Sequence, residues 1–170
     1  MKEYVDAFDY AGHICKAMKR GILLTTKDGD KVNTMTIGWG TLGIEWGKPI
    51  FVAYVRESRY TRELLDKIGE FTINIPLDGV DAGVIGYCGK YSGRDRDKIA
   101  DMGLSLEHPE KIAVPGIRQM PLTLECKVRF RNVQDERSLP EPLRTRYYPG
   151  DPADFHIAYY AEIVSAYKII

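Results

Sequence analysis

Residues 122 to 131 alternate strictly between apolar and polar side chains. The apolar positions are Leu122, Leu124, Cys126, Val128 and Phe130, and the polar positions are Thr123, Glu125, Lys127, Arg129 and Arg131. Because successive side chains of a β-strand point to opposite faces of the sheet, this period of two predicts a strand with one face in the core. The other face is expected to lie in water.

Several other segments have the composition of strands. Residues 21–26 and 32–37 flank an Asp28-Gly29 pair that favours a tight turn, so they are predicted to form a hairpin. Further strands are expected at 40–43, at 49–55, at 71–75 as a half-buried strand, and at 156–170. Since no regular strand–helix–strand repeat occurs, the predicted fold is mainly β with short helices. It is expected to be an antiparallel β-barrel with helical insertions, not a doubly wound sheet.

Charged and hydroxyl residues follow the strand at 49–55. Thr61 is predicted to cap a helix that ends at Gly69, so this helix would begin beside Arg56, Ser58 and Arg59. Free backbone N–H groups at a helix start attract anions, and Arg binds phosphate oxygens with paired donors. The pattern is typical of a phosphate site, but a plain cap with solvated arginines explains it equally well.

The second half of the chain contains a helix signal and a long loop signal. Ser92 is expected to cap a short helix at 96–102 that ends at Gly103. Residues 138–152 are rich in Pro and predict a long loop or excursion, which we expect to shape access to any ligand site nearby.

Composition limits the classes of function. The chain of 170 residues fits a single domain over 1–170, and its 24 basic and 24 acidic side chains cancel. A neutral chain without a basic stripe argues against a nucleic-acid partner. No apolar run is long enough to cross a membrane, and Met1 to Tyr4 lacks the apolar core of a signal peptide. We therefore expect a soluble, cytoplasmic protein with no membrane partner.

The cysteines and histidines are scattered. Cys15, Cys88 and Cys126 have no metal-ligand spacing, and so neither a disulfide framework nor a metal site is predicted. A free Cys on an apolar strand face usually behaves as a small hydrophobe, which is the role expected for Cys126. Glycine fingerprints for dinucleotides or nucleoside triphosphates are also absent from the sequence.

Five motifs in a fixed order give the sequence a resemblance to a known family. They are Asn33–Gly40, Pro49–Val55, Ser58–Thr61, Gly69–Asn74, and Gly89–Asp95 together with Lys98. This series resembles the flavin reductase-like family, and its last motif resembles the flavoredoxin-like branch. The resemblance covers residues 21–98 and continues weakly through 121–128 and 156–163. It implies an FMN-binding split β-barrel, antiparallel and of Greek-key type.

The resemblance also implies which residues bind the cofactor. Contacts along the flavin are expected from Asn33, Met35, Thr36, Gly38 and Trp39. The FMN phosphate is expected at Ser58, Arg59 and Thr61, assisted by Arg56, and a second cluster for phosphate or ribityl is expected at Ser92, Gly93, Arg94, Asp95 and Lys98. Many relatives carry Ser before the Trp, whereas Gly38 stands here, so a backbone contact would replace that side chain.

Structural interpretations of these residues stay open. Gly38 and Gly40 would relieve barrel curvature, and Trp39 would belong to the core. Arg94 and Lys98 would be solvated charges at a helix start, and His156, a candidate for catalysis that faces nicotinamide or substrate, would be an ordinary surface or cap-bonded histidine.

The resemblance implies an NAD(P)H-dependent flavin reductase that takes hydride from NADH or NADPH and passes electrons through FMN to free flavin, a metal chelate or a partner protein. The alternatives are an FMN electron carrier like flavoredoxin, reduced by a redox partner protein, and a non-catalytic flavin-binding or interaction module. A homodimer is expected, as is typical of the family.

Overall fold

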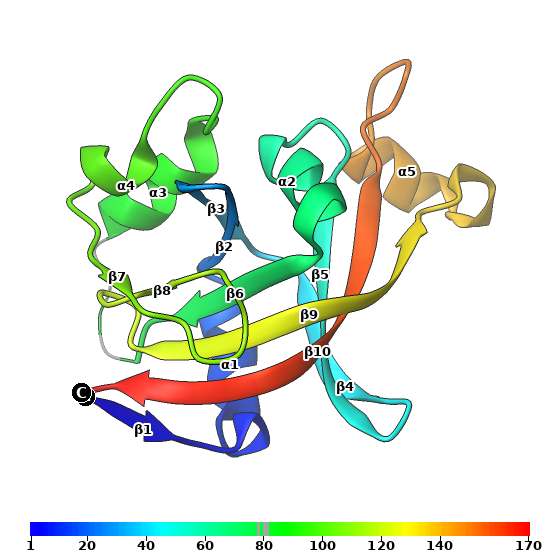
Figure 1. Ribbon diagram of the computed structural model, residues 1–170. Helices are drawn as coiled ribbons and strands as arrows, with labels where there is room; N and C mark the ends of the chain where they lie inside the picture. Colours follow the sequence, from blue (N-terminus) through cyan, green and yellow to red (C-terminus); the bar gives the residue numbers. More distant parts are fainter. Residues whose placement is uncertain (78, 80–81) are drawn as a thin grey trace.

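The protein is described by a computed structural model that covers every residue except 78 and 80–81 (Figure 1). The strands are β1 Lys2–Tyr4, β2 Ile22–Asp28, β3 Lys31–Ile37, β4 Gly40–Glu45, β5 Lys48–Arg56, β6 Glu70–Ile75, β7 Leu106–Glu107, β8 Gly116–Ile117, β9 Leu122–Val133 and β10 His156–Ile169. The helices are η1 Ala7–Tyr10, α1 Ala11–Met18, α2 Tyr60–Ile68, α3 Ala82–Lys90, α4 Lys98–Asp101, η2 Glu136–Ser138 and α5 Glu141–Tyr147.

The main sheet runs in the order β3-β2-β6-β9-β10-β5-β4, and β1 pairs with β10. Every pairing is antiparallel, and register shifts near Tyr160 and Ile163 interrupt the ladder between the long strands β9 and β10. Such bulges bend strands, and here the sheet curls until β3 approaches β5 without pairing to it. The predicted antiparallel barrel is confirmed, and it is split between β3 and β5.

Two tight turns set the register of the outer hairpins. The predicted hairpin at 21–37 is confirmed as β2 and β3, and Gly29 takes a φ of +56° in its turn. Trp46 and Gly47 join β4 to β5 with φ values of +53° and +68°, as a type I′ turn requires. Both strands that flank the split are therefore held by short local connections.

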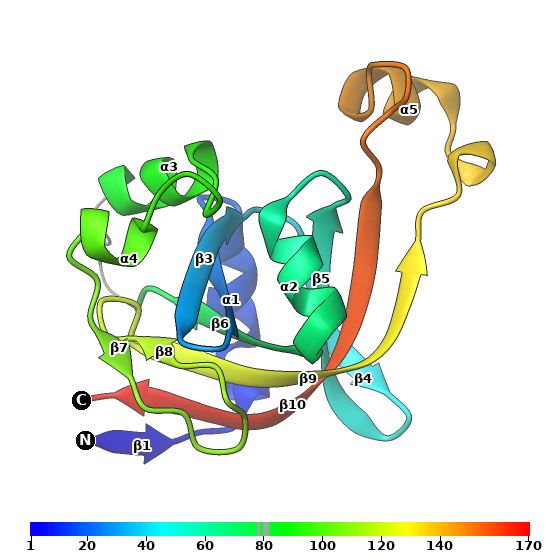
Figure 2. The same cartoon turned by 45° about the horizontal axis from the view of Figure 1, so that its top comes forward.

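The prediction that β6 and β9 each face water on one side is wrong for much of their length. Thr72, Asn74, Thr123 and Glu125 are fully buried, because the segment that carries β7 and β8 lies across this face of the sheet (Figures 1 and 2). Thr72 donates to the carbonyl of Pro115, for example. From Arg129 onward β9 is exposed on both faces, so Arg129 and Arg131 face water as expected, whereas the prediction that Phe130 faces the core is wrong.

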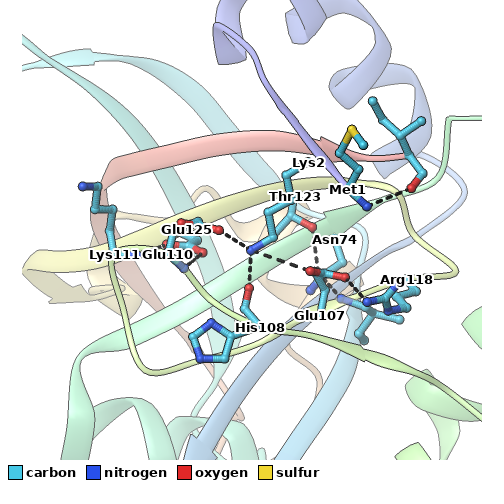
Figure 3. A network of polar contacts seen from close by, with 12 residues as sticks. Met1, Lys2, Asn74, Glu107, His108, Glu110, Lys111, Arg118, Thr123 and Glu125 are labelled. Atoms are coloured by element: carbon cyan, nitrogen blue, oxygen red, sulfur yellow. Dashed lines mark hydrogen bonds and ion pairs between the residues drawn. The ribbon is translucent and has the colours of Figure 1, made fainter.

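Glu125 anchors this covering segment from inside the sheet. Its carboxylate accepts hydrogen bonds of 2.7 Å from the backbone N–H groups of Glu110 and Lys111. Lys2 lies beside the same segment, bonding the carbonyl of His108 and, at 2.6 Å, the carboxylate of Glu110 (Figure 3). The buried charge is thus satisfied by two backbone donors, which is what a carboxylate without water requires.

We expect Glu125→Ala to destabilise the fold by about 2–4 kcal/mol, because it removes the partner of two backbone N–H groups and opens a cavity at a fully buried position. Denaturant unfolding monitored by circular dichroism measures the loss. Glu3→Ala is the control, since Glu3 is exposed and its one ion pair among the described residues is with Lys168 at the surface. Equal stability of Glu125→Ala and wild type would show that the carboxylate does not hold this segment.

Two predicted helix starts need correction. α2 begins at Tyr60 with Arg59 at the N-cap position, whereas Thr61 is buried in the first turn and caps nothing. Asp97 caps α4 by accepting from Ala100, while Ser92 only closes a turn by accepting from the N–H of Arg94. Gly69 and Gly103 do end their helices, with φ values near +60°. The helix starts shifted because these Thr and Ser hydroxyls bond elsewhere.

The expected loop at 138–152 contains a helix. It carries α5, and it forms an excursion between β9 and β10 at the end of the barrel away from the termini (Figure 2). Pro140 stands at the N-cap of α5 and Pro142 lies in its first turn, where a missing N–H costs nothing. The prolines that predicted irregular structure therefore begin a helix here.

Candidate functional site

Two adjoining cavities lie where the split of the barrel meets the start of α2. The first, of about 110 Å³, is lined by Met35, Ser58, Arg59, Tyr60, Thr61, Cys88, Tyr91, Ser92, Gly93, Arg94 and Lys98. The second, of about 170 Å³, is lined by Met35, Thr36, Ile37, Gly38, Trp39, Tyr54, Arg56, Arg59 and His156. Because they share Met35 and Arg59, we describe them together as the groove.

Most of the predicted site residues therefore come together. The exceptions are Asn33 and Asp95, which line a neighbouring cavity of about 450 Å³. Asn33 still reaches the groove, because its amide Nδ2 donates to the hydroxyl of Thr61 at 2.9 Å. Asp95 is exposed and does not line the groove.

Arg59 is the residue common to both cavities whose charge is free. Within the described part of the chain, its guanidinium makes no hydrogen bond, ion pair or ring contact. The side chain is exposed at the N-cap of α2, where no side chain caps the first backbone N–H groups. An unpaired guanidinium at a helix start is suited to an anion with several oxygens, such as phosphate.

Lys98 places a second cation at the base of the first cavity. It is only 4% exposed, and its Nζ contacts the carbonyls of Tyr91 at 3.1 Å and Cys88 at 3.4 Å. Burial, reinforced by the positive charge of Arg59, lowers the pKa of Lys98 to about 8. Among the described residues no carboxylate forms an ion pair with it. A bound anion would offset the cost of burying this charge.

Gly93 is closely packed between the side chains of Asn33 and Tyr60 at the wall of the first cavity. A Cβ at Gly93 would lie 2.0 Å from the Oδ1 of Asn33 and 3.0 Å from the ring of Tyr60, so only glycine fits. The same Oδ1 is buried and has no hydrogen-bond partner in the structure. Asn33 thus positions Thr61 on one side and the turn at residues 92–95 on the other.

Other predicted phosphate contacts are already engaged within the protein. Arg56 donates to the carbonyls of Tyr147 at 2.9 Å and Asp154 at 2.7 Å, so it ties down the excursion that carries α5. Ser58 donates its N–H and its hydroxyl to the carboxylate of Asp154. Arg94 forms an ion pair with Glu63 and lies over the ring of Tyr60. Their contribution to an anion site is therefore smaller than that of Arg59 and Lys98.

The two glycines around Trp39 have different roles. A Cβ at Gly40 would lie 2.8 Å from the ring of Phe51, so Gly40 is required by core packing. Gly38 has open space, its nearest neighbour being the carbonyl of Met18 at 3.6 Å, and it is free to offer its backbone to a ligand. Trp39 is 40% exposed, which corrects the interpretation that it belongs to the core.

Thr36, another residue expected along the flavin, donates its hydroxyl to the backbone carbonyl of Ile85 on α3.

His156 forms the far wall of the second cavity. Its ring lies 4.8 Å from that of Trp39, and its Nδ1 is 2.8 Å from the hydroxyl of Tyr148. Burial and the positive charge of Arg56 lower the pKa of His156 to about 4. The imidazole is therefore neutral near pH 7, when it offers a hydrogen bond but not a positive charge.

The shifted pKa of His156 predicts a pH dependence of stability. The unfolded state binds this proton below about pH 6.5, whereas the folded state binds it only near pH 4. Acid therefore favours the unfolded state between these values, so the contribution of His156 to the free energy of unfolding is complete above pH 6.5 and is lost as the pH falls toward 4. As the pH is lowered through this window, the denaturant midpoint should decrease more steeply for wild type than for His156→Gln. Parallel curves for the two proteins would mean that the imidazole is protonated in the folded state.

Several groove residues were missed from the sequence. Tyr54 and Tyr91 line the groove from a strand and a helix end, whose sequence patterns indicate only secondary structure. Tyr148 and Asp154 contact the groove residues His156 and Ser58 from the segment between α5 and β10. Only the fold brings this segment to the groove. The buried thiols of Cys88 and Cys126 have raised pKa values because of burial, which disfavours a nucleophilic role.

Comparison with known proteins identifies the class. The flavin reductase like domain family matches residues 16–167, and the chain belongs to this family. An uncharacterized protein of Archaeoglobus fulgidus is 29% identical over 99 residues, which cover 58% of this chain and 55% of that protein. The chain spans less than two thirds of the curated relatives that it matches.

Solved structures with the same fold include two flavoredoxins. The flavoredoxin of Methanosarcina acetivorans is 26% identical with a TM-score of 0.63, over 88% of this chain and 68% of that chain. The flavoredoxin of Desulfovibrio vulgaris (Miyazaki F) is 23% identical with a TM-score of 0.66, over 88% and 69%. The fold is the split barrel of flavin reductase-like proteins.

Proposed function

We propose that the protein is an FMN-binding oxidoreductase, and that it reduces its flavin with NADH or NADPH. The observation that carries the proposal is the pair of cations Arg59 and Lys98, which face one cavity without a carboxylate partner among the described residues. They fit the phosphate of FMN, and Thr61 and Ser92 add hydroxyls beside them. Solved relatives described as FMN-binding support the same cofactor.

The second cavity would hold the ring of the flavin. Gly38 offers open backbone, Met35 gives an apolar surface, and Trp39 and His156 close the wall. When bound, FMN would supply the redox chemistry, by accepting a hydride and passing electrons on. The neutral His156 would donate or accept a hydrogen bond without a fixed charge, and it would hold Trp39 in place through their ring contact.

The acceptor of the electrons would be free flavin, a metal chelate or a partner protein. The second candidate is an electron carrier, which the similarity to two flavoredoxins favours. Adding NADH or NADPH to the FMN-loaded protein without oxygen separates the two. Loss of the flavin absorbance bands supports a reductase, whereas bands that persist with nicotinamide and disappear with dithionite support a carrier. The reductase proposal is then wrong.

We also propose that the protein is a homodimer. The outer face of the sheet exposes Phe130, which is 48% exposed and lies 5.3 Å from the ring of Tyr160, and the β4–β5 hairpin exposes Ile44 and Trp46. Exposed apolar groups of this size are typical of contact surfaces. Light scattering should give twice the mass of 19.3 kDa. A monomer at micromolar concentration with normal flavin content would contradict the dimer.

Location and domain organisation stay predictions. No helix in the described part of the chain is long and apolar enough to span a membrane. A cytoplasmic location is consistent with the proposed reaction, since NADH and NADPH are intracellular reductants. A single domain over 1–170 is proposed as well. Fractionation of cells that produce the protein would test the location.

A further inference from the structure

Asp154 places a carboxylate on donors that the sequence motif assigns to a phosphate. Its Oδ1 accepts from the backbone N–H of Ser58 at 3.0 Å, and its Oδ2 accepts from the Ser58 hydroxyl at 2.7 Å. Ser58 lines the first cavity of the groove and stands just before the N-cap of α2. A carboxylate thus occupies both donors of a residue at which an anion is expected.

The position of Asp154 is fixed from the neighbouring strand. Arg56 donates to the Asp154 carbonyl at 2.7 Å, and the N–H of Glu57 donates to the carbonyl of Phe155 at 3.0 Å. These bonds involve backbone oxygens, so they hold the residue without neutralising its carboxylate. In the described structure no Lys, Arg or His lies within ion-pair distance of that carboxylate. Its negative charge therefore remains at the edge of the groove.

A phosphate and this carboxylate compete for the same donors. Ser58 has one N–H and one O–H, and both are used. A phosphorylated ligand must either displace Asp154 or bind beside a second negative charge, and each alternative costs free energy. A ligand with the same ring and no phosphate bears neither cost.

We propose that Asp154 is a specificity-determining residue of the flavin site, which lowers the affinity for FMN relative to unphosphorylated riboflavin and so makes the flavin exchangeable. This inference rests on the proposed function. Arg59 and Lys98 provide the attraction for the phosphate, and Asp154 limits it. The balance suits a protein that releases reduced flavin, because the phosphate is held without the contribution of Ser58.

The test compares two ligands in the same protein. The purified full chain is titrated with FMN and with riboflavin, and quenching of flavin fluorescence gives both dissociation constants for wild type and Asp154→Asn. Asn keeps the shape and one acceptor for Ser58 but removes the charge. We expect FMN to bind about tenfold more tightly to the variant, with riboflavin changed by less than about twofold.

A matched control separates local from overall charge. Asp151→Asn removes one negative charge from the same exposed excursion, where the side chain is exposed and makes no hydrogen bond or ion pair within the described structure. We expect its ratio of FMN to riboflavin affinity to equal that of wild type. An equal gain in Asp151→Asn would mean that the effect is general electrostatics, and the inference would be wrong.

The remaining outcomes are also decisive. An unchanged or weaker FMN affinity in Asp154→Asn overturns the inference and assigns Asp154 to holding Ser58 in place. If Asp154→Asn binds neither flavin, Asp154→Ser is tested, since it also lacks the charge, and loss of both flavins there overturns the inference as well. If wild type binds neither flavin, the proposed function itself fails.

Discussion

Arg59→Ala should lose about tenfold to hundredfold in FMN affinity while the free energy of unfolding stays within about 0.5 kcal/mol of wild type. The reason is that the Arg59 guanidinium makes no bond within the described structure, so its removal breaks nothing in the fold. A charged hydrogen bond to phosphate would be lost, however. Calorimetric titration with FMN and denaturant unfolding measure the two quantities.

Two comparisons make the Arg59 experiment specific. Riboflavin affinity should hardly change in Arg59→Ala, because riboflavin has no phosphate. Arg137→Ala removes the same charge from an exposed side chain that, among the described residues, bonds only Asp135, and it should leave both affinities unchanged. Equal weakening of FMN and riboflavin by Arg59→Ala would place the arginine at the ring and not at the phosphate.

Gly93→Ala should destabilise the fold by about 1–3 kcal/mol and also weaken FMN binding. The new Cβ would lie 2.0 Å from the Oδ1 of Asn33, so either the turn at residues 92–95 or the strand β3 must move. Both flank the first cavity, and a shift there separates Ser92 and Lys98 from Thr61. Thermal unfolding and FMN titration of the same samples measure the coupled losses.

A second substitution tests the cause of the Gly93 effect. In the double variant Asn33→Ala with Gly93→Ala the clashing amide is gone, so the double variant should be more stable than the sum of the two single changes predicts. Gly43→Ala is the control, since a Cβ there meets nothing within 4 Å. Additive effects of Asn33→Ala and Gly93→Ala would show that the contact is not the source of the loss.

The barrel could be predicted from the sequence because local patterns determine it. The alternation at residues 122–131 and the Asp28-Gly29 turn depend on strand period and turn geometry, which act over a few residues. The burial of Thr72 and Glu125 could not be predicted, because the segment that covers them is distant in the chain. Polar side chains on a strand predict a solvent-exposed face, and this prediction fails where a distant polar segment covers that face.

The candidate site was predicted from motifs, and its internal bonding was not. The resemblance implied Arg59 and Lys98 as members of two separate clusters, and the structure places both at one cavity. The motifs did not indicate that Arg56 and Ser58 bond the excursion through Asp154, or that Asn33 joins Thr61 to the Gly93 turn. Such contacts between distant segments depend on the closure of the whole sheet.

Flavin content measures the central proposal most directly. The purified full chain is brought to equilibrium with FMN by dialysis, and the excess of flavin absorbance on the protein side is recorded against protein concentration. We predict an excess that corresponds to about one FMN per chain, and its loss in Arg59→Ala. A folded wild-type protein that gives no excess of flavin absorbance, and does not quench FMN fluorescence at saturating concentration, would contradict the assignment of the groove to FMN.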